Sequence, residues 1–356
     1  MNLPIPPSGL PGVGAPARLT VRTPADMIAA VPYLLGFHPA DSLVAVGFND
    51  SKGVGAIRID LPDPGDPSED RTCGSQIVAV LRNRGFRKAI LIGFGSERAV
   101  EPLGRRLIQD AAEAGLRIVD LLRVQDGRWW SLNCPNPACC PPEGVPFDPS
   151  ALPVSASAVF QGLVAEASRD DLALRLAPVV AELPAMREAV ACAERRHHDT
   201  RHIDPRRTPK ETITGFLRGL DDLRARTRDG GPKATVEEIA ELSVLLGNLR
   251  LRDEAWIRID TDDPGVDVAL WTDVLRRTTP ELAAAPASLL AFAAYMTGKG
   301  ALANLALDRA ERANPNYALA ALVRVTISQG VPLSRLRDFV NREDVDRAYG
   351  APSEST

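Results

Sequence analysis

The feature that most constrains the fold is a regular alternation of strand and helix signals between residues 42 and 132. Apolar strand-like segments cover residues 42–48, 54–61, 88–94 and 116–124. Helices open at Asp66-Pro67 and at Ser96, and Gly85 and Gly115 close them. Because a strand, a helix and a further strand form a parallel pair with a right-handed crossover, this order predicts parallel strands.

Two short turns complete the predicted sheet. The turn at residues 49–53 joins the first two strands as an antiparallel hairpin, and Asp126-Gly127 is a tight turn into a strand over residues 128–132. We therefore predict an α/β domain with a mixed, roughly five-stranded sheet and flanking helices. An all-α region follows it.

The segment before the first strand carries strong local signals. Thr23 is a typical N-cap and Pro24 suits the first helical position, so a helix begins here. Pro32 is expected to end or kink this helix near Val31. Gly36 suits a left-handed residue that closes the next turn.

Composition shifts divide the chain into five expected parts. These are a disordered lead-in (1–18), the α/β domain (19–150), a helical domain (151–285), a helical hairpin with a C-terminal helix (286–340) and a flexible tail (341–356). Within the helical part, Ser168 caps one helix and Pro178 separates it from a helix that runs through Met186 to about His198. Two further helices are predicted at about 209–228 and 235–251.

The predicted hairpin is similar to one tetratricopeptide-type repeat. Leu290, Gly298, Ala303, Ala310 and Pro315 stand at the positions of that repeat's leucine, turn glycine, packing alanines and closing proline. Its usual large positions hold smaller side chains in this chain: Ala287, Ala294 and Leu307. Since one repeat cannot bury its own core, we expect the hairpin to pack on the preceding helices.

Charge and cysteine content limit the class of protein. The formal charge is −4 in 356 residues, which argues against a general nucleic-acid binder. No apolar run approaches a membrane span, and residues 1–18 lack the pattern of a signal peptide. Five cysteines, an odd number, fit a reducing compartment. We therefore expect a cytoplasmic protein that does not bind membranes.

The predicted topology gathers polar residues at one edge of the sheet. The carboxyl ends of the parallel strands and the start of the first strand share this edge, which brings together His38, Asp41, Ser42, Asp63 and Ser96. We predict the main concave pocket, and a ligand site, at this edge. A serine, histidine and carboxylate also permit a nucleophile hypothesis, but ordinary turn hydrogen bonds of Asp41 and Ser42 are favoured, with His38 partly buried.

Two other groups could bind metal. Cys134, Cys139 and Cys140 offer three thiols, and a structural zinc site needs a fourth ligand, from Cys73, Cys192 or a histidine. We favour buried thiols or a disulfide from Cys134 over metal, because paired CxxC spacing is missing. Trp130 or its neighbour Trp129 is expected to cover this loop, the other entering the core.

His198 and His202 stand one helical turn apart. Nearby arginines would repel a cation, so we favour a solvated basic face there.

Three segments together carry a family resemblance. The run PYLLGFHPADSLV at residues 32–44, Arg128-Trp129-Trp130-Ser131 and the CCPPEG run at residues 139–144 resemble an actinobacterial family known only as a domain of unknown function. The resemblance covers about residues 19–335. It supplies no catalytic residue, substrate or cofactor.

Two classes of function fit these observations. We favour a binding or regulatory module, in which the α/β domain holds a small ligand or a partner and the helical region provides a surface for a protein partner. The alternative is a hydrolase or transferase that uses the carboxyl edge of the sheet. The ligand, cofactor and catalytic residues remain unknown at this level.

Overall fold

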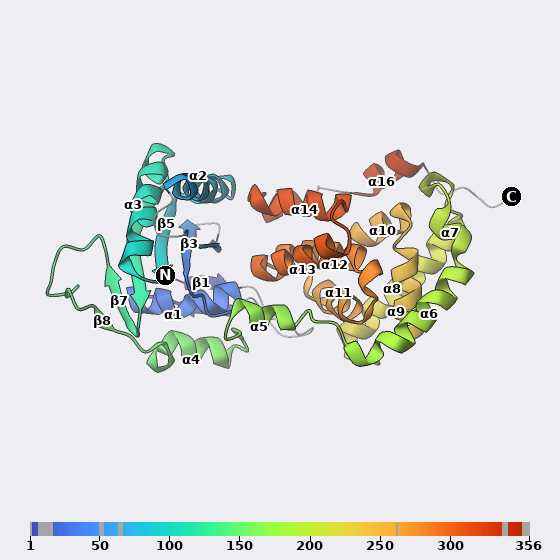
Figure 1. The fold of residues 1–356 in the computed structure, drawn as a ribbon, viewed down its shortest axis with the longest axis horizontal. Coiled ribbons are helices and arrows are strands. Elements are labelled where there is room, and N and C mark those ends of the chain that lie inside the picture. Colours follow the sequence, from blue (N-terminus) through green and yellow to red (C-terminus); the bar gives the residue numbers. More distant parts are fainter. Residues whose placement is uncertain are drawn as a thin grey trace.

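A computed structural model describes residues 2–5, 17–49, 53–62, 67–260, 263–336 and 341–350. The α/β region and the helical region lie at the two ends of the long axis (Figure 1). The α/β region contains β1 (Asn2–Ile5), β2 (Ala17–Thr20), α1 (Pro24–Leu35), β3 (Ser42–Asn49), β4 (Gly53–Asp60), α2 (Pro67–Asn83), β5 (Lys88–Phe94), α3 (Glu97–Glu113), β6 (Arg117–Gln125), β7 (Arg128–Ser131), β8 (Val145–Pro146) and α4 (Pro153–Phe160).

The helical region follows directly. It contains α5 (Arg169–Leu174), α6 (Leu183–Arg196), α7 (His198–His202), α8 (Lys210–Asp229), α9 (Val236–Leu245), α10 (Leu249–Trp256), α11 (Gly265–Arg277), α12 (Ala284–Met296), α13 (Gly300–Ala313), α14 (Ala318–Ser328), α15 (Leu333–Leu336) and α16 (Arg342–Tyr349). Short 3-10 helices lie at Pro149–Ala151, Val180–Glu182, Pro205–Arg207 and Pro280–Leu282.

The main sheet is mixed, as predicted. Its strand order is β4-β3-β5-β6-β7-β8, in which β3 runs antiparallel to both neighbours and β5 pairs in parallel with β6. The described residues give it six strands rather than five. The additional strand, β8, is two residues long and pairs Val145 with Trp129. A strand this short has no alternating apolar pattern, so the sequence did not predict it.

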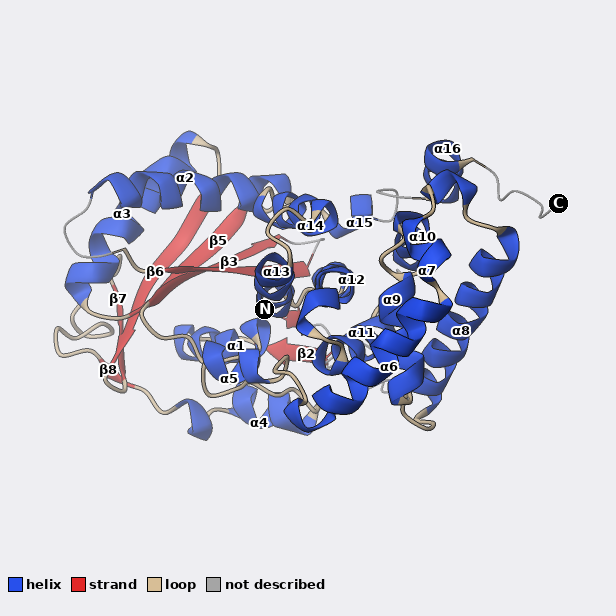
Figure 2. Cartoon of the chain, turned by 45° about the vertical axis from the view of Figure 1, so that its right-hand side comes forward, coloured by secondary structure: helices blue, strands red, loops and turns tan. Residues whose placement is uncertain are grey.

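Helices cover both faces of the main sheet, with α2 and α3 over one face and α1 and α4 over the other (Figure 2). Val44 and Val46 pack with α1 and α4 on one face. Leu43 and Ala45 pack with α2 and α3 on the other face. Both faces are therefore buried, which explains why β3 reads as a continuous apolar run.

The helix α1 begins as predicted but does not end at Pro32. Thr23 Oγ1 accepts from the Asp26 amide at 3.1 Å, and the Asp26 carboxylate accepts from the Thr23 amide at 3.0 Å. The helix continues through Pro32 to Leu35, and Gly36 closes it with φ 86°. Pro32 is itself buried with Val31, and we attribute the tolerated loss of one helical hydrogen bond to this packing.

Both ends of the chain contain structure where disorder or flexibility was predicted. Asn2–Ile5 pairs antiparallel with Ala17–Thr20, although residues 6–16 of the expected lead-in lie outside the described residues. In the expected tail, Asn341 caps α16. The Arg342 guanidinium then donates to both carboxylate oxygens of the buried Glu254 at 2.7 Å, which ties α16 to α10.

The helical region follows its capping signals closely. Ser168 caps α5 through the Asp171 amide, as predicted. The single helix expected over 235–251 is instead two helices, α9 and α10. Asn248, which is buried, accepts from the Arg250 and Leu251 amides and so starts α10.

The helices α12 and α13 form the predicted hairpin. Every residue of α12 is buried, between α11, α13 and α14 among others. The hairpin thus packs on the preceding helices, as expected. Its resemblance to a tetratricopeptide-type repeat stays a prediction.

Two sets of contacts join the two regions, one near the bottom and one near the top of Figure 1. Phe37, which follows α1, is 1% exposed and belongs to the helical core. Its neighbours exchange backbone bonds with Glu166, whose amide donates to the Gly36 carbonyl and whose carbonyl accepts from the His38 amide, both at 2.9 Å.

The second set of contacts joins the end of α2 to α12 and to the segment after α14. Asn83 Nδ2 donates to the Gln329 carbonyl at 2.8 Å, and Gly330 packs so closely on Val80 that a Cβ there would lie 2.6 Å from a Val80 methyl. Arg84 also donates to the Tyr295 hydroxyl at 2.9 Å.

We predict that Gly36→Ala lowers the free energy of unfolding by about 1 kcal/mol, because alanine is strained at φ 86°. The matched control is Gly215→Ala at an exposed position of α8, where a Cβ meets no atom within 4 Å. That change should stabilise by up to about 1 kcal/mol through helix propensity. Urea denaturation measures both, and equal effects of the same sign would contradict the left-handed cap.

Candidate functional site

The sheet edge predicted as a site has the expected strand geometry. Ser42 at the start of β3 pairs with Asp60 at the end of β4 and with Phe94 at the end of β5. The start of one strand and the ends of two others therefore meet at one edge, as the topology required.

The side chains of the four edge residues that the structure describes do not form a hydrogen-bonded group. His38 is exposed rather than partly buried, whereas Ser42 is fully buried with no hydrogen-bond partner for its hydroxyl among the described residues. Asp41 has φ 42°, and its carbonyl accepts from the Leu61 amide. Ser96 is exposed and does not cap α3 through its side chain. Asp63 lies outside the described residues, so the predicted site stays a prediction.

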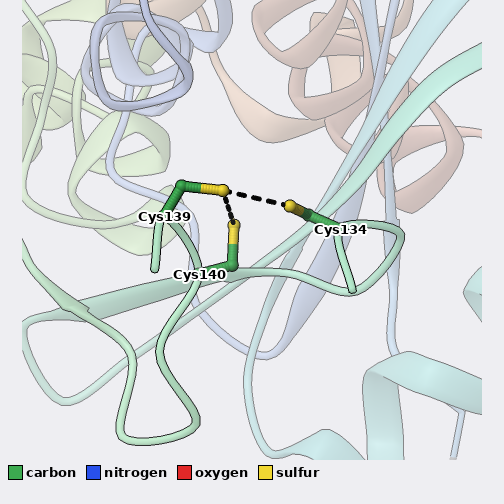
Figure 3. A group of neighbouring side chains, drawn as sticks. All are labelled: Cys134, Cys139 and Cys140. Carbon is green, nitrogen blue, oxygen red and sulfur yellow. Dashed lines mark hydrogen bonds between the residues drawn. The ribbon is translucent and has the colours of Figure 1, made fainter. Parts of the chain in front are cut away.

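The three cysteines after β7 converge (Figure 3). The Cys134 and Cys139 sulfurs are 3.3 Å apart, the Cys139 and Cys140 sulfurs are 3.8 Å apart, and all three lie within 4.8 Å of one another. They are free thiols, and Cys139 is exposed. Burial, one of the favoured interpretations, therefore does not describe Cys139.

Their surroundings shift the pKa values of two of these thiols in opposite directions. A bond to the backbone of Asn136, with bonds to the other two sulfurs, lowers the pKa of the Cys134 thiol. Burial and the neighbouring sulfurs raise the pKa of the Cys140 thiol to about 12. Cys73 has no described side chain, and Cys192 is exposed on α6.

The side chains of His198 and His202 lie near each other on α7. His198 is 72% exposed and lies 3.4 Å from the Asp199 carboxylate. Its ring centroid is 5.1 Å from that of His202. Among the described residues, the three cysteines form the group of potential metal ligands, and this pair joins no such group.

A cavity that the sequence did not predict lies where the two regions meet. Its volume is about 190 Å³. The walls come from the end of α1, the loop after α4, α5, α11 and the start of α13. Most of them are apolar, and they include Tyr33, Leu34, Leu163, Leu172, Val268 and Leu302.

Besides Tyr33, which carries a hydroxyl on an apolar ring, the polar side chains that line the same cavity are Arg175, Thr272 and Lys299. Arg175 makes an ion pair with Glu166 at 3.4 Å. Among the described residues, the Lys299 ammonium and the Thr272 hydroxyl have no hydrogen-bond or ion-pair partner. Burial, helped by the charge of Arg175, lowers the pKa of Lys299 to about 8.

The start of α13 adds uncommitted backbone donors. Lys299 is the N-cap of this helix and makes no side-chain cap hydrogen bond. A Cβ built on Gly300 would meet no atom within 4 Å. The first amides of α13 thus begin beside a cation without a partner among the described residues, where a helix N-terminus favours an anion.

The sequence signals for this cavity are weak. Its walls come from segments near residues 33–36, 163–176, 268–272 and 299–302, which local patterns cannot bring together. The one usable signal is Gly298-Lys299-Gly300, a lysine in a helix-to-helix turn with no acidic residue nearby in sequence.

A family model described as "Domain of unknown function (DUF4192)" matches residues 24–333. The chain belongs to this family. The match confirms the resemblance predicted over residues 19–335, and leaves the actinobacterial origin as a prediction. The searches of curated proteins and of solved structures each found no match.

The matched segment of the DUF4192 domain contains the candidate groups described above, the histidine pair among them. It runs from α1 into α15 and so includes the sheet edge, the cysteine loop and the junction cavity. None of the helices in the described part of the domain combines the length and the apolar character that a bilayer crossing requires.

We predict that Lys299→Met stabilises the DUF4192 domain at about pH 7 by about 1 to 3 kcal/mol, because it removes a desolvated, unpaired cation. The folded pKa of about 8 lies below the ordinary 10.5. The destabilisation is therefore complete below pH 8 and is relieved as pH rises between these values, so the gain should shrink in that window.

Denaturation at pH 7 and pH 10 measures this difference. The matched control is Lys233→Met, since Lys233 is exposed and lines a different cavity. A Lys299→Met variant less stable than the parent at pH 7 would contradict the desolvated, unpaired state.

Proposed function

We propose that the DUF4192 domain is a small-ligand-binding module that takes an organic anion with a compact apolar body into the junction cavity. The observation that carries the proposal is the Lys299 ammonium, which lines this cavity without an acidic partner among the described residues. A cytoplasmic location and a regulatory role belong to the same proposal.

The polar groups support an anion rather than a neutral ligand. A buried cation without a partner is unfavourable, and a bound carboxylate would supply the missing charge. Arg175 would provide a second cation, and the Thr272 hydroxyl and the first amides of α13 would provide donors. Much of the affinity for an anion would thus come from Lys299 and Thr272, which the fold leaves unsatisfied, while Arg175 would be shared with Glu166.

The walls and the volume limit the apolar part. An apolar cavity of about 150 Å³ holds one benzene, so a cavity of about 190 Å³ suits a body near the size of one ring. An arylacetate such as phenylacetate combines one apolar ring with one carboxylate. Larger amphiphiles would have to extend through the mouth, where Val164 is 59% exposed.

The alternative, a hydrolase or transferase at the sheet edge, lacks a comparable observation. Catalysis by Ser42 would need a base within hydrogen-bond reach, whereas its hydroxyl makes no hydrogen bond to a described residue. We therefore place the ligand site at the junction cavity.

We predict that phenylacetate raises the thermal midpoint of the domain, while benzyl alcohol and benzylamine, which share the ring, do not. A ligand at about 100 times its Kd should add about 2.7 kcal/mol. Thermal shift finds the effect, and calorimetric titration gives the Kd.

Lys299→Met should abolish the phenylacetate shift, and Arg175→Met should weaken it. Lys233→Met is the charge-matched control and should bind as the parent does. Equal stabilisation by the acid, the alcohol and the amine, or full binding by Lys299→Met, would refute the proposed anion site.

A further inference from the structure

The cysteine loop combines convergence with exposure. Three sulfurs from Cys134, Cys139 and Cys140 point toward one another (Figure 3), and Cys139 remains open to solvent. Thiols that only fill a core are buried among apolar side chains. This group instead presents three soft donors at a surface.

Backbone hydrogen bonds hold two of the three cysteines. The Asn136 side chain accepts from the Ala138 amide at 3.0 Å. The Asn136 carbonyl accepts from the Cys139 and Cys140 amides at 3.3 and 2.9 Å. This turn brings Cys139 and Cys140 back over Cys134.

The far side of the loop is fixed to the sheet. Trp130 Nε1 donates to the Pro142 carbonyl at 3.0 Å, and Arg128 donates to the Gly144 carbonyl at 2.9 Å. The Arg123 guanidinium lies 3.6 Å over the Trp130 ring, which holds that indole in place. Trp130 thus covers the loop, while Trp129 is buried in the core.

We propose that Cys134, Cys139 and Cys140 bind one thiophilic d10 metal ion, Zn²⁺ or Cu(I), through three thiolates, with any further coordination position left to solvent or to an exogenous ligand. This site is separate from the junction cavity and does not depend on the ligand proposed there.

The distances suit such an ion. A Zn–S bond is about 2.3 Å, so three sulfurs around one ion lie about 3.8 to 4.0 Å apart. The observed separations of 3.3 and 3.8 Å, with every pair within 4.8 Å, need shifts of less than about 1 Å. The loop therefore holds its donors close to a coordinating arrangement before any ion binds.

The number of donors favours an open site. No other His, Cys, Asp or Glu within the described part of the chain joins this group. Structural zinc sites use four protein ligands, whereas sites with an open position use three. Thiolates select Zn²⁺ and Cu(I) over harder ions. Exposure of Cys139 would let the ion exchange with a chelator or a partner.

A disulfide is the competing use of the same sulfurs. Oxidation of two thiols would form one S–S bond and release two protons and two electrons to an oxidant, leaving the third cysteine free. The metal proposal requires all three sulfurs together, whereas a disulfide requires two. Substituting one cysteine at a time therefore distinguishes the metal site from the disulfide.

The test uses the full chain, reduced with a phosphine and handled without oxygen. Zn²⁺ is titrated against the chromogenic chelator 4-(2-pyridylazo)resorcinol, and Cu(I) is titrated against bathocuproine disulfonate. We expect the protein to withdraw one equivalent of at least one ion, with thiolate-to-metal charge-transfer absorption that saturates at one equivalent. The two titrations show which ion it prefers.

Cys134→Ser, Cys139→Ser and Cys140→Ser should each lose the stoichiometric binding. Cys192→Ser, which changes an exposed cysteine on α6, should keep it. Unchanged thermal midpoints of the metal-free variants would show that the fold is intact. Failure to withdraw either ion, or binding that survives all three loop substitutions, would overturn the proposal.

Discussion

Burial of Phe37 in the helical core is the interaction on which the arrangement of this molecule depends. Phe37 lies between α1 and β3, so its position is fixed by the sheet, yet its ring packs among helical residues. The backbone exchange with Glu166 holds the chain on both sides of it. Because α1 and α5 are thereby held side by side, the walls of the junction cavity come together.

Much of the fold could be predicted because its signals are local. Thr23, Ser168 and the Asp126-Gly127 turn act within a few residues of themselves, and each behaves as its chemistry indicates. The failures occur where tertiary packing outweighs local preference. The helix α1 continues through Pro32, which is buried there. The buried Asn248 starts α10 where the apolar pattern had predicted one continuous helix.

The candidate sites were predicted less well, for a physical reason. Strand direction alone placed Ser42 beside the ends of β4 and β5, but it could not say whether the side chains there would bond one another. The cavity depends on segments that are more than 100 residues apart, and on an absence of acidic partners around Lys299. The cysteines were visible in sequence, while their convergence depends on the turn that Asn136 builds.

Within the described residues, the α/β and helical regions are joined near Phe37 and, well apart from it, between Asn83 and Gln329. Two separated contacts restrict the relative motion of the two regions more than one contact would, which favours a cavity that is already formed before a ligand enters. A molecule that binds there would meet a preformed site, and little free energy would be lost in ordering it. Association would then be governed by diffusion to the mouth of the cavity, and differences in affinity between ligands would arise mainly from how slowly each one leaves.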